Sequence, residues 1–288
     1  MVGLWTSLSE SLLVSALVVY VLATLAFSVR SALLRSASPD RGEVRTAVVG
    51  RDVAGMVGVS LSVLAFGLVG VGVVVRTVAG RQPVLGNMFE FAIVSVFTAT
   101  GAFLLIGRKT GQSRQLGLLA ILPVTITLTL ALVVLYDEPG GLVPALQSYW
   151  MTIHVTAAAL AVGAVTVGTV GCALQLRAQR RGDADAVGRA DAVARGAYAF
   201  AFPVWTFAVT TGAVWAQYAW GRYWGWDPKE VWAFVTWIFL AAYLHSRHTR
   251  GVGKRTTAVV GIVAYGTLLF NFVGVNVWFT GLHSYAGL

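Results

Sequence analysis

The chain has 288 residues, of which 57% are hydrophobic and only 11% are charged. Soluble domains carry about 25% charged residues, so this composition excludes a soluble globular protein and predicts a polytopic membrane protein. The formal net charge is +9, and the one cysteine, Cys172, excludes both an internal disulfide and a cysteine-based metal site.

Eight apolar runs approach the length needed to cross a bilayer, which is about 20 mostly apolar residues. They are residues 9–29, 53–75, 89–107, 116–135, 149–176, 197–217, 230–246 and 256–275. The N-terminus lacks the basic segment that precedes a cleavable signal, so the first run is expected to be retained as a helix. The predicted fold is an all-α membrane bundle of about eight transmembrane helices.

The connecting segments alternate in charge, which predicts the orientation of the bundle. Four of them, 30–52, 108–115, 177–196 and 247–255, hold all but four of the 21 Lys and Arg residues. Under the positive-inside rule these segments are cytoplasmic, and both termini are extracytoplasmic. This topology accounts for the basic excess, so no nucleic-acid partner is predicted. Segment 177–196 is expected to be a solvated helical connector.

The third outward segment, 218–229, leads into the stretch WGRYWGWDPKE over residues 220–230. Its last four residues have the pattern of a helix start. Asp227 accepts a bond from an early backbone N–H, Pro228 suits the first helical turn, and Glu230 completes a capping box. This pattern accounts for the charged residues but leaves the tryptophans unexplained.

Three tryptophans fall within seven positions of this loop, and two more follow at Trp232 and Trp237. An interfacial aromatic belt explains tryptophans that are scattered around a bundle. Concentration in one loop, with Gly221 and Gly225 allowing close approach, instead favours a flat surface for a planar apolar ligand such as a porphyrin. Arg222 and Lys229 would then meet acidic groups at the edge of that ligand.

The chain has only four histidines, and the topology puts His154 and His283 on the same membrane face as the Trp-rich loop. Taken alone, a histidine in a span usually bonds to a neighbour, and a histidine in a tail is usually exposed. Ionisable residues within spans are nevertheless more often functional than structural. Imidazole is a common axial ligand of haem iron, so together they predict a bis-histidine haem site. His245 lies near the cytoplasmic boundary, where it either caps a helix end or ligates haem at an inner site. His248 lies at the same helix end, so it cannot face His245 across an iron atom.

These residues resemble the WWD domain of haem-handling proteins and, within that group, the CcsA (ResC) family of system II cytochrome c maturation. The Trp-rich stretch continues to Trp232, Trp237 and Leu244-His245 as in that family. Three further stretches agree: Ser148-Tyr149-Trp150 with His154, Gly281-Leu282-His283-Ser284-Tyr285, and Pro83 with Asn87 and Glu90, where Gly86 replaces the usual Ser. The resemblance divides the chain into N-terminal helices over 1–82 and a haem-handling core over 83–288, with the WWD loop at 218–232.

The resemblance implies a function for each of these residues. His154 and His283 would be the axial ligands of haem b at an outer site, and His245 would hold haem in transit with a second ligand from the partner CcsB (ResB). The loop would hold the ring through Trp220, Trp224, Trp226, Trp232, Asp227, Arg222 and Lys229. The chain would act in the cell membrane as the unfused subunit of a holocytochrome c synthase. Its substrate would be an apocytochrome c with a Cys-x-x-Cys-His motif, and a thioredoxin-like protein would reduce the thiols.

Three alternatives remain open at the level of sequence. A CcmC-like haem delivery protein shares the loop and histidines but usually has six spans. A HemX-like regulator of haem synthesis usually lacks the complete WWD stretch. A secondary transporter would show inverted repeats and broken helices, and no repeat is evident. No side chain is assigned as a catalytic acid or base, and Asp227 is expected to cap its helix or orient a neighbour.

Overall fold

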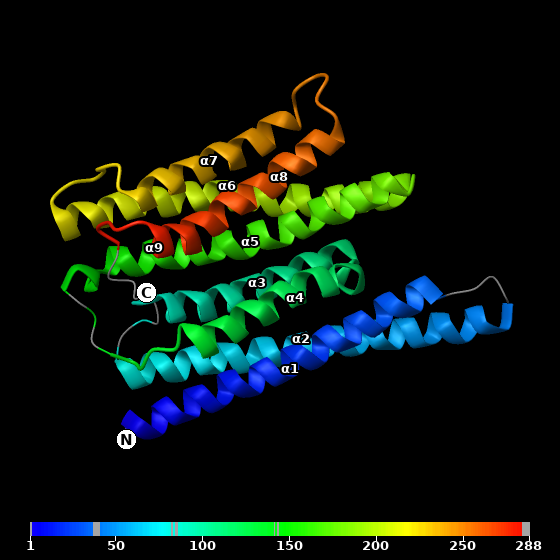
Figure 1. Cartoon of the computed structure of the whole chain (residues 1–288), viewed down its shortest axis with the longest axis horizontal. Coiled ribbons are helices and arrows are strands. Elements are labelled where there is room, and N and C mark those ends of the chain that lie inside the picture. Colours follow the sequence, from blue (N-terminus) through cyan, green and yellow to red (C-terminus); the bar gives the residue numbers. More distant parts are fainter. Residues whose placement is uncertain are drawn as a thin grey trace.

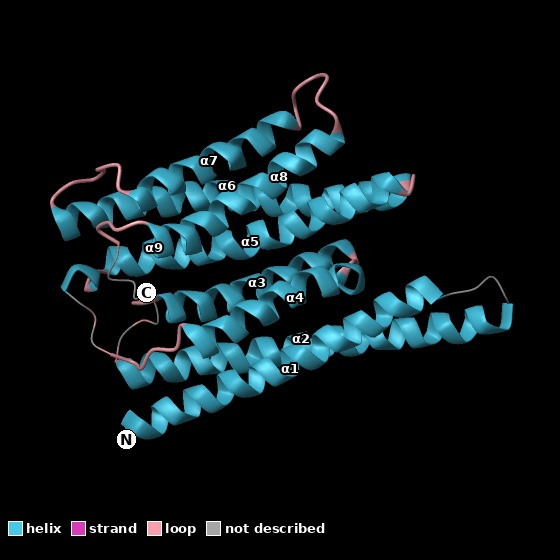
Figure 2. Ribbon diagram, viewed as in Figure 1, coloured by secondary structure: helices cyan, strands magenta, loops and turns pink. Residues whose placement is uncertain are grey.

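The computed structural model describes residues 2–36, 41–81, 83, 86–140, 142 and 144–283, with only the backbone of residues 2, 35, 36 and 41–51. Within these residues all regular secondary structure is helical, which confirms the all-α prediction (Figure 2). The helices are α1 (Val2–Ser36), α2 (Arg41–Gly80), α3 (Met88–Thr110), α4 (Ser113–Val134), η1 (Pro144–Leu146), α5 (Tyr149–Arg180), α6 (Ala184–Trp220), α7 (Pro228–Ser246), α8 (Lys254–Leu269), a π-helical turn η2 (Phe270–Gly274) and α9 (Val275–Trp278).

Seven segments of the described chain are long and apolar enough to cross a membrane. They are α1 to α6 and the continuous run of α8, η2 and α9. Helix α7, which was predicted as a further span, has 19 residues but is not one of the seven. Its mean hydropathy is too low, because Lys229, Glu230 and His245 are polar. It nevertheless packs along α8 (Figure 1).

The connections between helices fall at two ends of the bundle (Figure 1). The ends of α1 and α2 that adjoin residues 37–40 lie with the α3–α4, α5–α6 and α7–α8 connections, where the sequence is rich in arginine. The opposite end, called here the Trp-loop end, holds the α2–α3, α4–α5 and α6–α7 connections and residues 279–283. The predicted alternation of the connecting segments is therefore present in the fold.

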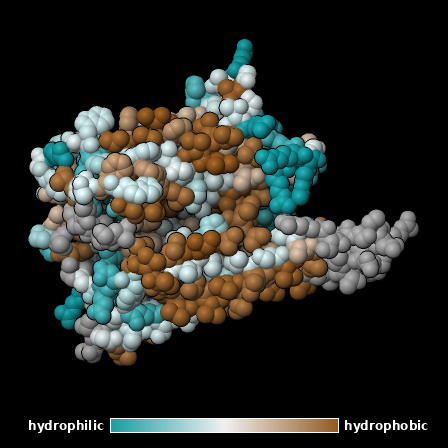
Figure 3. All heavy atoms as spheres, in the orientation of Figure 1, coloured by the Kyte–Doolittle hydropathy of each residue, from teal (hydrophilic) through white to brown (hydrophobic). Residues whose placement is uncertain are grey.

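Hydrophobic side chains cover much of the visible flank of the bundle, and hydrophilic ones gather toward its ends (Figure 3). Leu105 and Val133, for example, are 65% and 75% exposed. Apolar surface of this kind is stable in lipid, where side chains on the outside of a span face hydrocarbon. Together with the seven long helices, it describes a multi-pass membrane protein.

Helix α5 lies between two halves of the bundle and contributes to both of their cores. One core joins α1 to α4, and the other joins α5 to α8. The crossing of α3 and α5 is close: a Cβ atom on Gly163 would lie 2.6 Å from the carbonyl carbon of Thr98. Thr98 Oγ1 also donates a hydrogen bond of 2.7 Å to the carbonyl of Ala159 across this crossing.

We expect Gly163→Ala to destabilise the protein by about 1–3 kcal/mol, because the added methyl group meets backbone atoms that cannot rotate away. Gly188→Ala is the matched control, since nothing lies within 4 Å of its Cβ position in α6. Thermal unfolding of the purified protein in detergent measures both variants. Equal unfolding temperatures for the two would contradict the close crossing.

Candidate functional site

An apolar cavity at the Trp-loop end is lined by residues from α3, η1, α5, α6, α7, α8 and η2 and by the chain around His283. Most of its wall is aliphatic or aromatic. His154 and His283, which are 129 positions apart in the sequence numbering, both line it, together with Trp215, Trp220 and Trp224. The fold thus brings the two outer histidines and part of the Trp-rich loop to one cavity.

His154 projects from α5 toward α6, where its Nδ1 lies 2.7 Å from the carbonyl oxygen of Ala208. A carbonyl only accepts hydrogen bonds, so Nδ1 carries the proton and Nε2 keeps its lone pair. Gly212 provides the space, because a Cβ atom there would lie 2.7 Å from the imidazole ring. The ring is therefore fixed in one tautomer, with the nitrogen that can bind a metal left unprotonated.

His283 is oriented by Asp227, since its Nδ1 lies 2.8 Å from Asp227 Oδ2. The backbone N–H of Leu282 donates to the other carboxylate oxygen, also at 2.8 Å. Gly281 allows this approach, because a Cβ atom there would lie 2.5 Å from Asp227 Oδ1. The carboxylate accepts a hydrogen bond from Nδ1–H, so in the neutral imidazole the Nε2 lone pair is free to bind a metal. A carboxylate behind a histidine is a common support for metal ligation.

Asp227 has a second role at the start of α7, where it and Glu230 form the predicted capping box. Glu230 Oε2 accepts the backbone N–H of Asp227 at 3.0 Å. Burial acts to raise the pKa of Asp227, but the hydrogen bonds from His283, Leu282 and Lys229 outweigh it and the pKa lies below its usual value. The side chain is therefore ionised at neutral pH and can hold the Nδ1 proton of His283.

Trp215 lies close to both histidines and was not singled out from the sequence. Its ring centroid is 6.2 Å from that of His154, with the planes almost parallel, and 5.8 Å from that of His283. The two imidazole centroids are therefore no farther apart than the sum of these distances. Position 215 falls inside an apolar run, so the sequence suggests a core residue. The available signal was its place near the outer end of that run, five residues before Trp220.

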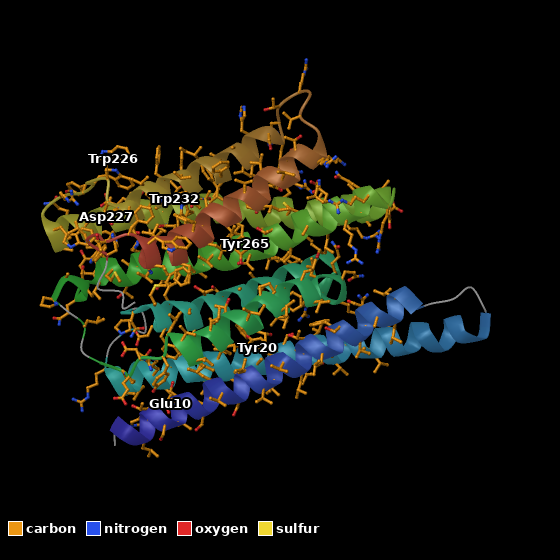
Figure 4. The ribbon with its side chains drawn as sticks, viewed as in Figure 1. Glu10, Tyr20, Trp226, Asp227, Trp232 and Tyr265 are labelled. Carbon is orange, nitrogen blue, oxygen red and sulfur yellow. The ribbon has the colours of Figure 1, made fainter. Side chains whose placement is uncertain are left out.

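The residues of the Trp-rich loop divide between the cavity and the outside. Figure 4 labels Trp226 and Asp227 in the connection that leads into α7. Trp220 and Trp224 line the cavity, whereas Trp226 is 67% exposed and has a left-handed φ of 59°. The rings of Trp224 and Trp226 are perpendicular, so the loop does not form one flat surface in this structure. Trp232 packs against Phe270 with a centroid distance of 4.2 Å and is not among the lining residues.

The two basic residues of the loop also have different surroundings. Arg222 folds back on the loop, with Nη1 3.4 Å from the carbonyl of Gly225, and does not line the cavity. A Cβ atom on Gly225 would lie 1.6 Å from Arg222 Nη1, so a side chain at this position would displace the guanidinium group. Lys229 lines the cavity, and its Nζ donates to Asn276 Oδ1 at 2.5 Å.

His245 lies in the last turn of α7, at the arginine-rich end of the bundle and far along the helix from the cavity. Its side chain is exposed. His248 follows in the α7–α8 connection, with its backbone N–H bonded to the carbonyl of His245. Ser284 and Tyr285, which belong to the tail motif of the sequence, lie outside the described residues.

One wall of the cavity is fixed by a buried ion pair. Arg76 of α2 donates through Nε to Glu90 Oε1 at 3.0 Å, and the two side chains are 2% and 7% exposed. Glu90 Oε2 accepts the backbone N–H of Gly86, and Asn87 caps α3 by accepting the N–H of Glu90. A Cβ atom on Gly86, where the resemblance leads us to expect Ser, would lie 2.3 Å from Leu142 Cδ2, so a side chain there would require Leu142 to change its rotamer.

We expect Arg76→Met to destabilise the protein by about 3–5 kcal/mol, because it leaves the carboxylate of Glu90 buried without its partner. Arg81→Met removes the same charge from an exposed position at the same end and serves as the control. Thermal unfolding in detergent is the measurement. A loss no larger than that of the control would show that the ion pair contributes little.

The two imidazoles of the cavity suit a metal whose other ligands belong to a bound molecule. Among the described residues, no three His, Cys, Asp or Glu side chains form a group that could hold a bare metal ion. Two imidazoles on an aromatic cavity instead match the two axial positions of an iron held in a macrocycle. Chemically, the cavity can bury a flat apolar molecule and ligate its metal.

Residues 85–283 match the family model described as cytochrome C assembly protein. A cytochrome c biogenesis protein CcsA from Trieres chinensis is 32% identical over 252 residues, which cover 73% of this chain and 80% of that protein. The chain belongs to the CcsA family. CcsA of Prochlorococcus marinus is 31% identical over 241 residues, covering 73% of this chain and 77% of that one. CcsA of Synechococcus elongatus is 51% identical over 84 residues, covering 29% and 26%.

Among solved structures, the cytochrome c heme lyase CcmF superposes with a TM-score of 0.63 at 18% identity. The match covers 94% of this chain and 49% of CcmF, so the chain spans about half the length of that protein. At this identity the likeness shows a shared fold. Membership of the CcsA family and the membrane-spanning helices place the chain among the multi-pass membrane proteins of cytochrome c biogenesis.

Proposed function

We propose that the chain holds haem b between His154 and His283 and delivers it for covalent attachment to an apocytochrome c. The observation that carries this proposal is the state of the two imidazoles. Each uses Nδ1 in a hydrogen bond, to Ala208 or to Asp227, and keeps the lone pair of Nε2 for a metal. In this proposal haem is the substrate, and the cavity residues Trp215, Trp220 and Trp224 bury its apolar ring.

Attachment requires the protein to position its substrates more than to move protons. Each cysteine thiol of a Cys-x-x-Cys-His motif adds its S–H across one vinyl C=C bond, so no atom is lost and no further oxidant is needed. Holding thiol and vinyl group together can lower the barrier by several kcal/mol. The histidines and Asp227 hold the haem, the aromatic wall excludes water from the ring, and no described side chain is assigned as acid or base.

The partners follow from the same proposal. A CcsB (ResB)-like membrane subunit would complete the synthase, and a thioredoxin-like protein would reduce the thiols of the apocytochrome. The arginine-rich connections would face the cytoplasm, which places the cavity on the extracytoplasmic face of the cell membrane. His245, exposed at the opposite end, would bind haem in transit together with a ligand from CcsB.

His245→Ala should lower the haem content of the complex with CcsB at least severalfold, because one of two axial ligands at the inner site is lost. Haem per complex is measured from the absorbance of the pyridine adduct. His248→Ala, two residues into the neighbouring connection, is the control. Normal haem content in the His245 variant would remove this residue from the transit route.

The activity itself is tested by co-expressing the chain with a CcsB-like subunit and a reporter apocytochrome c. After denaturing electrophoresis, covalently bound haem on the reporter is detected by its peroxidase stain. We expect stained reporter with the wild-type chain and none when either the chain or the reporter cysteines are absent. A chain that binds haem but never yields a stained reporter would instead favour haem delivery without attachment. A purified protein without any haem absorbance would contradict haem handling altogether.

A further inference from the structure

Lys229 is the only Lys or Arg among the described residues that line the cavity. Its side chain is partly buried, and no carboxylate of the described chain lies within 4.0 Å of its Nζ. The two acidic neighbours along the chain are engaged elsewhere: Glu230 Oε2 accepts the backbone N–H groups of Gly225 and Asp227, and Asp227 is bonded to His283 and to the backbone of Leu282. A cation beside an apolar wall is costly unless an anion pairs with it, so this arrangement points to an anionic ligand.

Asn276 holds the ammonium group in place. Its Oδ1 accepts from Lys229 Nζ at 2.5 Å, while its Nδ2 donates to the carbonyl of Phe272 at 3.1 Å and contacts Met88 Sδ. Asn276 lies two residues after the end of the π-helical turn η2, and such turns often occur at functional sites. An ammonium group has three donors, and Asn276 takes one of them, so donors remain for a ligand.

We propose that Lys229, positioned by Asn276, is a carboxylate anchor that selects which edge of the porphyrin enters the cavity. This inference rests on the proposed function and adds a determinant of orientation to it. Haem carries two propionates on one edge, and its vinyl groups lie away from that edge. A carboxylate held at Lys229 therefore fixes the position of the vinyl groups that must meet the thiols. Arg222, which folds onto Gly225, does not share this role.

The test compares protoporphyrin IX with its dimethyl ester, which lacks ionised carboxylates. Neither probe contains iron, so their binding does not depend on ligation by the histidines. Quenching of tryptophan fluorescence in the purified protein gives the dissociation constants. Lys229→Met should weaken binding of the free acid about tenfold or more, equivalent to about 1.4 kcal/mol, and leave binding of the ester unchanged.

Two further variants keep the test decisive. Asn276→Ala should weaken binding of the free acid in the same direction by a smaller factor, because the ammonium group remains but is no longer held. Arg81→Met removes a positive charge from the same end outside the cavity and should bind both probes as the wild type does. If Lys229→Met does not fold, Lys229→Gln and Asn276→Ala are measured in its place.

Equal weakening of both probes would show that Lys229 supports the cavity without binding carboxylate, and would overturn the proposal. Unchanged binding of the free acid by Lys229→Met would overturn it as well. So would inorganic phosphate that weakens binding of the acid and of the ester to the same extent. Failure of the proposed function has a different signature, since haem would then bind no more tightly than metal-free porphyrin.

Discussion

Replacing His154 with glycine should remove most of the haem that co-purifies with the chain and abolish the six-coordinate spectrum of what remains. The physical reason is that Nε2 of His154 is held toward the cavity by the bond from Nδ1 to Ala208, and no other described histidine lines that wall. Glycine leaves a hole of imidazole size, so added imidazole should restore part of the haem and its spectrum. The same result is expected for His283→Gly.

The measurement is the optical spectrum of protein purified with and without imidazole, normalised to protein content. His248→Gly is a suitable control, since that residue is exposed at the opposite end of the bundle. It should retain the wild-type haem content. Wild-type spectra for both His154→Gly and His283→Gly would remove these residues as ligands.

Replacing Asp227 with alanine should lower haem affinity by about 10–100-fold, the usual effect of losing the partner of a metal-ligating histidine. It should also destabilise the protein by about 1 kcal/mol, because the cap of α7 is lost. Asp183→Ala is the matched control: Asp183 caps α6 by accepting the N–H of Ala186 at 2.9 Å, at the other end of the bundle. It should cost similar stability and leave haem affinity unchanged.

Asp227→Asn separates the two roles of this residue. The amide oxygen can still accept backbone N–H groups and cap the helix, but the side chain no longer presents a charge to the Nδ1 proton of His283. We expect near-normal stability together with a raised reduction potential of the bound haem, because the histidine becomes a weaker donor to iron. An unchanged potential would mean that Asp227 only caps the helix.

The sequence predicts the helices well because long apolar runs leave few alternatives in a membrane. The capping box at Asp227 and Glu230 was also predictable, since it depends on residues only three positions apart. Helix α7 shows the limit of hydropathy: its polar first turn belongs to the site, and those same residues lower its apolar score.

Part of the lining of the candidate site was predictable from the sequence, but the contacts between its residues were not. The pairing of His283 with Asp227 joins residues 56 positions apart and follows from the packing of the last helix against α7. Trp226 was grouped with Trp224 by spacing, yet its left-handed backbone turns it outward. Trp215 was passed over because one tryptophan in an apolar run has no local signal of contact with two histidines.

A structure of the haem-loaded protein would test the central claim most directly. We predict one iron atom bound by Nε2 of His154 on one side and Nε2 of His283 on the other, with Nδ1 of each still bonded to Ala208 and Asp227. Iron ligated by any other pair of residues, or haem lying outside the cavity, would contradict it.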